Sequence, residues 1–324
     1  MKLSELSENQ GIAINVTRRY VQLCDGKGEL HKGRLASKAL ETCIGDVVTY
    51  EHKDDEVFVT DFEERKNFLT RTFSGKTKKI AANLDHLFIV SAPAPEFHRG
   101  FVDRALTAAR SELISCSLIV NKTDLGLENI KEQLDVYSAL KTPIIYTSAK
   151  SEDGITSLRE MLENVDLNII CFTGLSGVGK SSILSSLLPG VEIEVRELGP
   201  KQRGRHTTTR SYAYRYNRAG DPLFLIDLPG IQSFGVEHLT PEDIDRAFDE
   251  IADAVGTCKF KGCTHVSEPG CQVIELLDRG VLPQSRYLSM LELRAEASTP
   301  EWQLKGGGEA PRPYADFDDK DEGY

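Results

Sequence analysis

The sequence predicts a multidomain protein with an N-terminal β-barrel, a central α/β domain whose sheet is mostly parallel, and a C-terminal α-helical domain that binds a metal. Three observations predict this fold class. Short alternating segments with regular turns fill residues 1–66, segments of strand and helix character alternate from about residue 82, and a group of cysteines with a histidine follows residue 235. Short, evenly spaced strands favour a barrel, whereas strands that alternate with helices favour a parallel sheet covered on both faces.

Composition narrows the class of protein. The 324 residues carry 39 Lys and Arg against 50 Asp and Glu, which gives a formal net charge of −11. No apolar run reaches the roughly 18 residues of a membrane span, and the polar start, MKLSELSENQ, lacks the apolar core of a secretion signal. Seven cysteines, an odd number, favour a reducing compartment over a disulfide framework. We therefore expect a cytoplasmic protein, and the acidic total does not exclude nucleic acid because binding depends on local patches.

The N-terminal segment, residues 1–66, has the pattern of a small barrel. Residues 11–16 and 20–24 alternate between apolar and polar side chains, Asp25-Gly26 is a hairpin turn signal, and strands at 45–50 and 56–60 follow. A β-module without a ligand fits this pattern as well as a binding barrel does. Residues 65–79 then hold six Lys and Arg and no acid. This run is either a solvated linker, assigned to residues 67–80, or a segment that follows a phosphate backbone.

The central segment, residues 81–234, alternates between strands and helices. Buried strands are expected at 87–90, 117–120, 143–146 and 168–172, with helices at 102–112, 127–140 and 154–164. Residues 235–299 then form the helical metal-binding domain. Residues 300–324 are rich in Gly, Pro and Asp, which predicts a disordered acidic tail.

A phosphate-binding loop follows the strand at 168–172. The stretch matches G-x-x-x-x-G-K-[ST] at every fixed position and opens a predicted helix, which is the context this motif requires. Glycines let the loop turn its N–H groups toward phosphate oxygens, while the lysine reaches the β- and γ-phosphates and the hydroxyl ligates Mg²⁺. The candidate residues are Gly174, Leu175, Ser176, Gly177, Val178, Gly179, Lys180, Ser181 and Ser182.

Two short motifs indicate that the nucleotide is guanine-based. Asn121, Lys122 and Asp124 follow the strand at 117–120, and Ser148-Ala149-Lys150 follows the strand at 143–146. An ionised Asp124 would accept from N1–H and the exocyclic amine of guanine, and adenine presents no such pair of donors. Lys122 would cover the base plane with its aliphatic stem, and the Ser148–Lys150 segment would supply a backbone N–H. A capped helix start explains Asp124 equally well when it is taken alone.

Switch elements complete the predicted site, but in an unusual order. An apolar strand at 223–226 ends in Asp227-Leu-Pro-Gly230, which suits an aspartate that holds Mg²⁺ through water and a glycine near the γ-phosphate. Within Thr207–Thr209, Thr208 or Thr209 would complete the Mg²⁺ shell. In ordinary GTPases the guanine motifs follow the phosphate loop, whereas here they precede it. The sequence therefore predicts a circularly permuted GTPase whose switch runs directly into the C-terminal domain.

The C-terminal segment contains a candidate zinc site. Cys258, Cys263, His265 and Cys271 fall within fourteen residues and supply the four N and S ligands of a closed, structural Zn²⁺ site. The alternative is a set of free cysteines in a loop. The remaining four cysteines lie in apolar surroundings and are expected to be core thiols.

Taken together, these motifs resemble the circularly permuted small ribosomal subunit-dependent GTPase A family, also called RsgA, YjeQ or EngC. The resemblance covers about residues 10–298 and rests on the order and spacing of all the motifs above. It implies an oligonucleotide-binding (OB-fold) barrel that binds RNA, a permuted GTPase domain and a zinc domain. It also implies GTP and GDP binding with Mg²⁺, contact with the 30S subunit and its 16S rRNA in late maturation, and hydrolysis that the subunit stimulates and that releases the factor. A cytoplasmic monomer without membrane or DNA partners is expected.

The resemblance also implies the site residues. The family's guanine motif falls on Asn121, Lys122 and Asp124, its phosphate-binding stretch on residues 174–182, and its zinc ligands on Cys258, Cys263, His265 and Cys271. Many GTPases place Gln directly after D-x-x-G to orient the attacking water, but this chain has Ile231, which forms no side-chain hydrogen bond. His206 is the candidate for the missing group, alongside Lys180 as the charge-stabilising residue, although a solvent- or RNA-facing histidine fits the sequence as well. The basic residues Lys201, Arg203, Arg205 and Arg210 flank the switch and are candidate rRNA contacts.

Two other functions compete with this one. Ile231 also suits a nucleotide-gated RNA-binding assembly scaffold in which hydrolysis is incidental. A small-molecule kinase would use the same phosphate loop, but Asp124 behind Asn121 and Lys122 argues against it.

Overall fold

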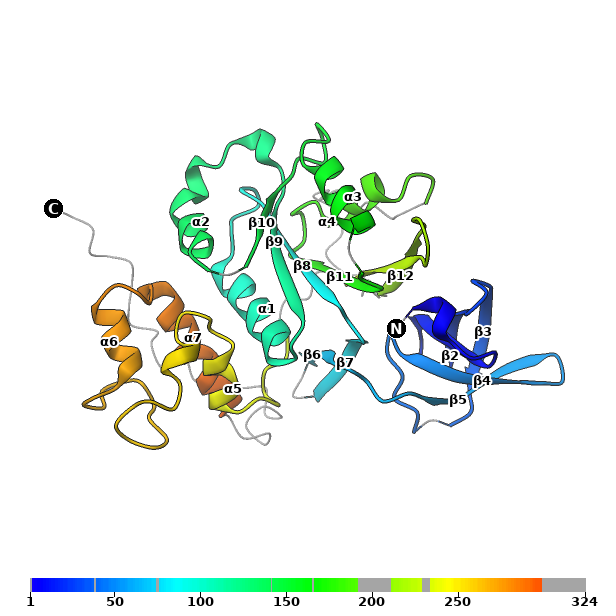
Figure 1. The fold of residues 1–324 in the computed structure, drawn as a ribbon, viewed down its shortest axis with the longest axis horizontal. Coiled ribbons are helices and arrows are strands. Elements are labelled where there is room, and N and C mark those ends of the chain that lie inside the picture. Colours follow the sequence, from blue (N-terminus) through cyan, green and yellow to red (C-terminus); the bar gives the residue numbers. More distant parts are fainter. Residues whose placement is uncertain are drawn as a thin grey trace, which may run out of the picture. The chain divides into compact units, whose positions relative to one another are not determined.

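The computed structural model describes residues 2–37, 39–73, 76–140, 142–164, 166–191, 211–228 and 234–298 (Figure 1). Its contacts divide the chain into two compact units. The first consists of Met1–Leu69, Lys79–Val102 and Glu112–Gln232, and the second of Thr70–Lys78, Asp103–Ser111 and Ser233–Tyr324. The tail predicted for residues 300–324 lies outside the described residues.

A closed barrel of five strands follows the short 3-10 helix η1 (Leu3–Glu5). Its strand order is β1-β2-β3-β5-β4, in which only β3 and β5 pair in parallel, as in the five-stranded Greek-key OB-fold. Alternate side chains, among them Val21, Leu23 and Val59, fill its interior and leave their neighbours to the surface. The strands are β1 (Gln10–Val16), β2 (Tyr20–Asp25), β3 (Leu30–Leu35), β4 (Val47–Lys53) and β5 (Glu56–Phe62).

The segment treated as a basic linker contains two paired strands, β6 (Phe68–Phe73) and β7 (Lys76–Ala82). Just before them, Arg65 is held by the buried Asp46, with Nε 2.7 Å from Oδ1, and Lys66 Nζ lies 2.8 Å from Asp85 Oδ1. These two cations of the basic run therefore have carboxylate partners within the protein.

A six-stranded sheet forms the centre of the first unit, with the order β10-β9-β8-β11-β13-β12. All neighbours are parallel except the edge strand β12. The helices α3 and α4 pack on one face through residues such as Leu158 and Ile183. The strands are β8 (His86–Ser91), β9 (Ser115–Val120), β10 (Ile144–Tyr146), β11 (Ile169–Gly174), β12 (Tyr212–Tyr216) and β13 (Leu223–Asp227); the helices of this region are α1 (Arg99–Ser111), η2 (Thr123–Leu125), η3 (Glu128–Ile130), α2 (Lys131–Ser138), α3 (Ile155–Asn164) and α4 (Lys180–Leu187).

The C-terminal region is helical, with α5 (Pro241–Arg246), η4 (Ala252–Ala254), α6 (Gln272–Asp278) and α7 (Gln284–Ala297). Thr240 begins α5 with a capping box, because its hydroxyl accepts from the Asp243 N–H while the Asp243 side chain accepts from the Thr240 N–H. Ile244, Phe248 and Met290 are buried in the core between these helices. The predicted fold class is thus confirmed, and none of the helices in the described part of the chain has the length and apolarity of a bilayer span.

Candidate nucleotide-binding site and metal cluster

The predicted nucleotide motifs that lie within the described residues follow four strands of the central sheet. Asn121 comes directly after β9, Ser148 follows β10, the phosphate loop follows β11, and Asp227 ends β13. Since the carboxyl ends of parallel strands lie at one edge of a sheet, segments that are distant in the sequence meet there. The fold therefore brings together the residues that sequence reasoning selected, in the described part of the chain.

The phosphate loop depends on two glycines with positive φ, Gly177 at 85° and Gly179 at 91°. Gly179 also allows a close approach, because a Cβ built on it would lie 2.2 Å from Asn121 Nδ2. A side chain at position 179 would thus push the guanine-motif asparagine away from the loop. The loop delivers Lys180 to the first position of α4.

Lys180 lies in a buried position, with 8% of its surface exposed. Burial lowers the pKa of its ammonium group from 10.5 to about 8, because the charged form loses hydration. In this structure the ammonium group forms an ion pair with the Asp227 carboxylate at the end of β13. The ammonium group that an anion would contact in this loop is therefore already largely dehydrated.

Asn121 and Lys122 connect the guanine motif to the phosphate loop. Asn121 Nδ2 donates to the Val178 carbonyl at 2.9 Å, and its Oδ1 accepts from Ala149 N at 3.2 Å. Lys122 Nζ donates to the Gly177 carbonyl at 2.6 Å. Sequence reasoning missed Thr147, whose hydroxyl also donates to Asn121 Oδ1 at 3.2 Å, because a single threonine before S-A-K carries no motif signal.

Asp124 lies in η2, and its carboxylate is oriented by the segment that follows β10. The Ser148 hydroxyl donates to Asp124 Oδ1 at 2.7 Å, and Lys150 Nζ lies 4.0 Å from its other oxygen. Ser148 is fully buried. The S-A-K segment therefore positions the aspartate in addition to offering its backbone. The remaining predicted residues, His206, Thr208, Thr209, Gly230, Ile231 and the basic Lys201, Arg203, Arg205 and Arg210, lie outside the described residues.

The four predicted metal ligands converge, with their ligand atoms all within 4.8 Å of one another. His265 Nδ1 lies 3.3 Å from Cys271 Sγ and 3.7 Å from Cys258 Sγ, and these two sulfurs are 3.9 Å apart. Sulfur atoms bound to one tetrahedral zinc at about 2.3 Å would lie roughly 3.8 Å apart, so the cluster fits this ion. Burial raises the pKa of the Cys263 thiol to about 12, and a bound cation would offset this cost of ionisation.

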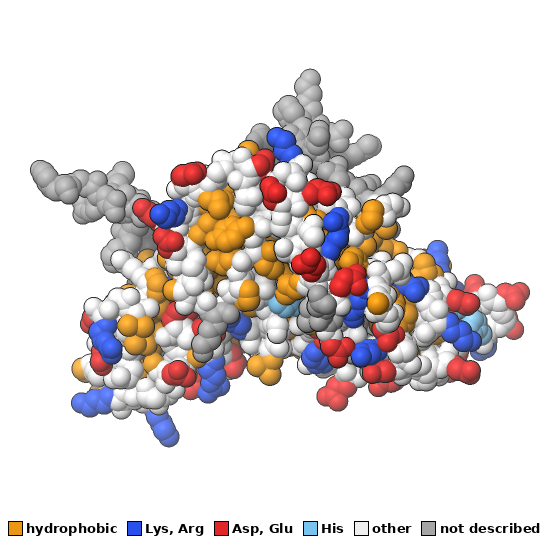
Figure 2. Space-filling view, turned by 45° about the horizontal axis from the view of Figure 1, so that its top comes forward, with side chains coloured by type: hydrophobic (Ala, Val, Ile, Leu, Met, Phe, Trp, Pro, Cys, Tyr) orange, Lys and Arg blue, Asp and Glu red, His pale blue; other side chains and the backbone are white. Residues whose placement is uncertain are grey.

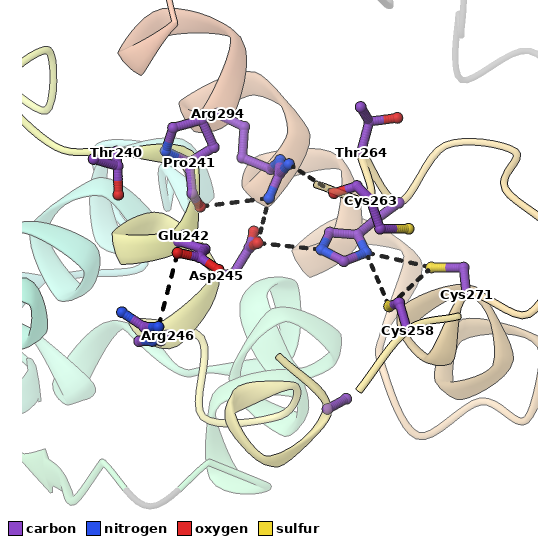
Figure 3. A network of polar contacts seen from close by, with 12 residues as sticks. Thr240, Pro241, Glu242, Asp245, Arg246, Cys258, Cys263, Thr264, Cys271 and Arg294 are labelled. Carbon is purple, nitrogen blue, oxygen red and sulfur yellow. Dashed lines mark hydrogen bonds and ion pairs between the residues drawn. The ribbon is translucent and has the colours of Figure 1, made fainter. Parts of the chain in front are cut away.

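Several side chains that contact the cluster were not anticipated from the sequence. Asp245 Oδ2 lies 3.1 Å from His265 Nε2, Arg294 pairs with the same carboxylate, and the Tyr287 hydroxyl donates to the His265 carbonyl at 2.7 Å (Figure 3 shows the first two contacts). They come from α5 and α7, twenty or more residues from His265 in the sequence. No spacing rule indicates them.

A second group, Asp25, Glu29 and His31 in the barrel, also places its ligand atoms within 4.8 Å. Its geometry is that of a turn, because Asp25 Oδ1 accepts from the backbone N–H groups of Lys27 and Glu29 and its Oδ2 lies 2.9 Å from His31 Nε2. Both oxygens of the aspartate are thus occupied.

Comparison with known proteins gives consistent matches. A family model described as RsgA GTPase matches residues 62–237. The chain is 34% identical over 287 residues to the Small ribosomal subunit biogenesis GTPase RsgA of Paraburkholderia phytofirmans, covering 87% of this chain and 90% of that protein. It is 39% identical over 297 residues to the protein of the same name from Saccharophagus degradans, covering 87% and 85%.

Solved structures match over most of their length as well. The crystal structure of YjeQ from Thermotoga maritima aligns with a TM-score of 0.69 and 29% identity, covering 89% of this chain and 98% of that one. YloQ, described as a circularly permuted GTPase, aligns with a TM-score of 0.65 and 21% identity, covering 90% and 96%, and supports the fold alone.

Proposed function

This chain belongs to the RsgA family of GTPases, and from that premise we propose that it acts in late maturation of the 30S ribosomal subunit. As a member of the family it is a GTP hydrolase of small-subunit biogenesis. In the finer proposal, the subunit stimulates hydrolysis and hydrolysis releases the protein. Residues 1–66 serve as the rRNA-binding barrel, 81–234 as the GTPase domain and 235–299 as the zinc domain of a cytoplasmic monomer.

One observation carries this proposal: four separate segments meet at one edge of the central sheet. The loop after β11 would hold the phosphates with its backbone N–H groups and the start of α4. Asp124 would accept from the two donors of guanine, with its carboxylate held by Ser148. The aliphatic part of Lys122 would lie along the base. Mg²⁺, bound with GTP, would neutralise phosphate charge beside Ser181 and Asp227.

The ion pair of Lys180 and Asp227 suggests how GTP prepares the site. Triphosphate oxygens are the stronger partner for a desolvated ammonium group, so GTP would draw Lys180 away from Asp227. The aspartate would then be free to hold a water of the Mg²⁺ shell. Lys180 and the loop N–H groups stabilise the charge that develops on the transferring phosphoryl group.

Water activation needs a group other than residue 231, since Ile231 has no hydrogen-bonding side chain. We assign this role to His206, with Thr208 or Thr209 completing the Mg²⁺ shell. Replacement of His206 by Ala should remove the stimulated hydrolysis and leave GTP affinity unchanged. Full stimulated turnover in this variant would exclude His206.

RNA contact by the barrel is supported by a groove of about 650 Å³ beside β2. Lys32 Nζ lies 4.8 Å above the ring of the exposed Tyr20, and Arg18 and Arg19 line the same groove. Aromatic faces beside cations are typical of sites that stack bases and follow a phosphate backbone. On the face of the molecule in Figure 2, acidic and basic side chains of the described residues are interspersed.

The deciding experiment is GTP turnover with and without purified small subunits. We expect the subunits to stimulate GTP turnover strongly. Charge reversal at Lys201, Arg203, Arg205 and Arg210 should abolish this stimulation and leave the intrinsic turnover unchanged. Lys131→Glu, on the exposed side of α2, is the control. Stimulation that survives the fourfold reversal would contradict the rRNA contact.

A scaffold in which hydrolysis is incidental remains the second candidate, because Ile231 favours it. A variant that binds GTP but does not hydrolyse it would still support subunit maturation on this alternative. Competition between GTP and ATP for binding distinguishes the GTPase and the scaffold from a small-molecule kinase. Equal binding of the two nucleotides would refute the guanine site built on Asp124.

A further inference from the structure

We propose that Asp245 is the positioning residue of the metal cluster. It orients His265 so that Nδ1 faces the three thiols and, together with Arg294, it joins the metal loop to helices α5 and α7. The inference rests on the zinc site of the proposed function but concerns residues that no metal-binding motif contains.

The orientation of His265 requires a partner on the far side of its ring. Nδ1 faces Cys271 and Cys258, so Nε2 is the nitrogen that carries the proton when Nδ1 binds a metal. His265 is 3% exposed, and a buried N–H needs an acceptor. Asp245 Oδ2, at 3.1 Å, is that acceptor (Figure 3). A carboxylate behind a metal-bound histidine fixes its tautomer and strengthens it as a ligand.

Asp245 is held in place by its own surroundings. It lies in α5 two residues after Asp243, the last residue of the capping box, and is 1% exposed. Arg294 of α7 donates to the same Oδ2 that faces His265, while Oδ1 has no hydrogen-bond partner among the described residues. Both partners thus contact the same oxygen, so Asp245 Oδ2 links Arg294 to the imidazole of His265.

Arg294 extends this contact to the backbone of the metal loop. Its Nη2 donates to the Cys263 carbonyl at 3.2 Å, and its Nη1 approaches the Pro241 carbonyl at 3.4 Å. The hydroxyl of Tyr287, which precedes Arg294 in the same helix α7, donates to the His265 carbonyl. These contacts hold His265 at a φ of 65°, a left-handed conformation that a non-glycine residue seldom adopts. The helices and the ligand loop therefore constrain each other.

The alternative is that Asp245 and Arg294 form a structural ion pair with no effect on the metal. The affinity for zinc distinguishes the positioning role from a purely structural ion pair. In the full-length protein, zinc titrated against a chromophoric chelator should bind Asp245→Ala about 10–100-fold more weakly than the unchanged chain. Asp253→Ala removes an exposed aspartate from η4 in the same region and should bind zinc normally. Unchanged affinity in Asp245→Ala would overturn the inference.

A measurement on the unchanged chain keeps the proposal testable if Asp245→Ala does not fold. In the zinc-loaded, ¹⁵N-labelled protein, His265 should show a metal-bound Nδ1 and a protonated, hydrogen-bonded Nε2. Ligation through Nε2 would overturn the positioning role. Failure of the unchanged chain to bind zinc at all would instead refute the zinc site itself, so the two claims fail in different ways.

Discussion

The nucleotide site and the metal cluster are built in opposite ways. The candidate nucleotide-site residues within the described part of the chain come from four segments between Asn121 and Asp227, and each segment lies at the end of a strand of one sheet. The metal ligands come from a single loop between Cys258 and Cys271. The first site is thus positioned by sheet topology, while the second is local in sequence but oriented by side chains from distant helices. Closeness in the chain is therefore a poor guide to what holds a site in shape.

The two sites also differ in how they are prepared for an occupant. In the nucleotide site, Lys180 pairs with Asp227 and Asn121 bonds to the loop carbonyl of Val178, so part of the site is engaged with itself. In the metal cluster, Asp245 holds the far side of the His265 ring and leaves Nδ1 facing the thiols. In the proposed function, GTP would displace the contact between Lys180 and Asp227, whereas a metal would bind between ligand atoms that already converge.

The largest effect is expected in the helices that support the metal loop. Arg286 of α7 is 1% exposed, and its guanidinium lies 2.6 Å from both Asp103 Oδ1 and Glu250 Oε1. Arg286→Met would leave two buried carboxylates without this partner and should lower the free energy of unfolding by about 3–5 kcal/mol. Chemical denaturation measures this loss of unfolding free energy. Arg279→Met, which breaks an exposed pair with Glu275, should cost under about 0.5 kcal/mol, and equal losses would contradict the argument.

The next effect concerns the charge at the phosphate loop. Lys180→Ala should lower kcat/KM for GTP by about 10²–10³-fold, because one preorganised donor to the transferring group is lost. Phosphate release measures turnover, with Lys131→Ala on α2 as the control. Near-normal turnover would contradict the role assigned to Lys180 in stabilising the transferring phosphoryl group.

The pH dependence of GTP binding tests the desolvation of Lys180. Because burial lowers its pKa to about 8, the nucleotide-free site loses its positive charge as the pH rises past that value. GTP binding must then take up a proton, so affinity should fall by up to about tenfold per pH unit above 8. The effect on folding has the opposite sign, since the buried charge destabilises the chain below pH 8 and this penalty is relieved as the pH rises toward 10.5. Affinity that is flat from pH 7 to 9, as expected for Lys180→Arg, would refute the shift.

The smallest effect is expected at Ser148, which orients Asp124 without contacting the base itself. Ser148→Ala removes one hydrogen bond to the carboxylate and should weaken GTP binding by roughly fivefold, equivalent to about 1 kcal/mol. Fluorescent GDP displacement measures this change. Asp124→Ala provides the upper limit, and a Ser148→Ala loss as large as that of Asp124→Ala would mean that the hydroxyl does more than orient.

Much of the fold could be predicted because strands with strong apolar patterns and motifs at their ends leave clear signals. The fold class and the convergence of Cys258, Cys263, His265 and Cys271 followed from such signals. Strand β3, with the sequence LHKGRL, was not anticipated, because only its ends are apolar. Its interior position is held by Gly33, which packs against Val59 and has no apolar side chain that a sequence pattern could show. Paired strands also occur where a basic run suggested a linker. The sequence did not indicate the roles of Thr147, Asp245 and Arg294. Their contacts depend on tertiary packing between helices and loops, which leaves no periodic pattern in the sequence.

The absence of a side chain at Gly179 makes two distant positions of this chain sterically dependent on each other. Its missing side chain is what lets the phosphate loop lie against Asn121, so a mutation at either position alters the space available to the other. Joining the old termini and opening the chain elsewhere changed which of these residues is synthesised first, yet the steric dependence between them is the same in either order. A side chain at position 179 should therefore displace Asn121 in this chain, whatever the order in which the two motifs are connected.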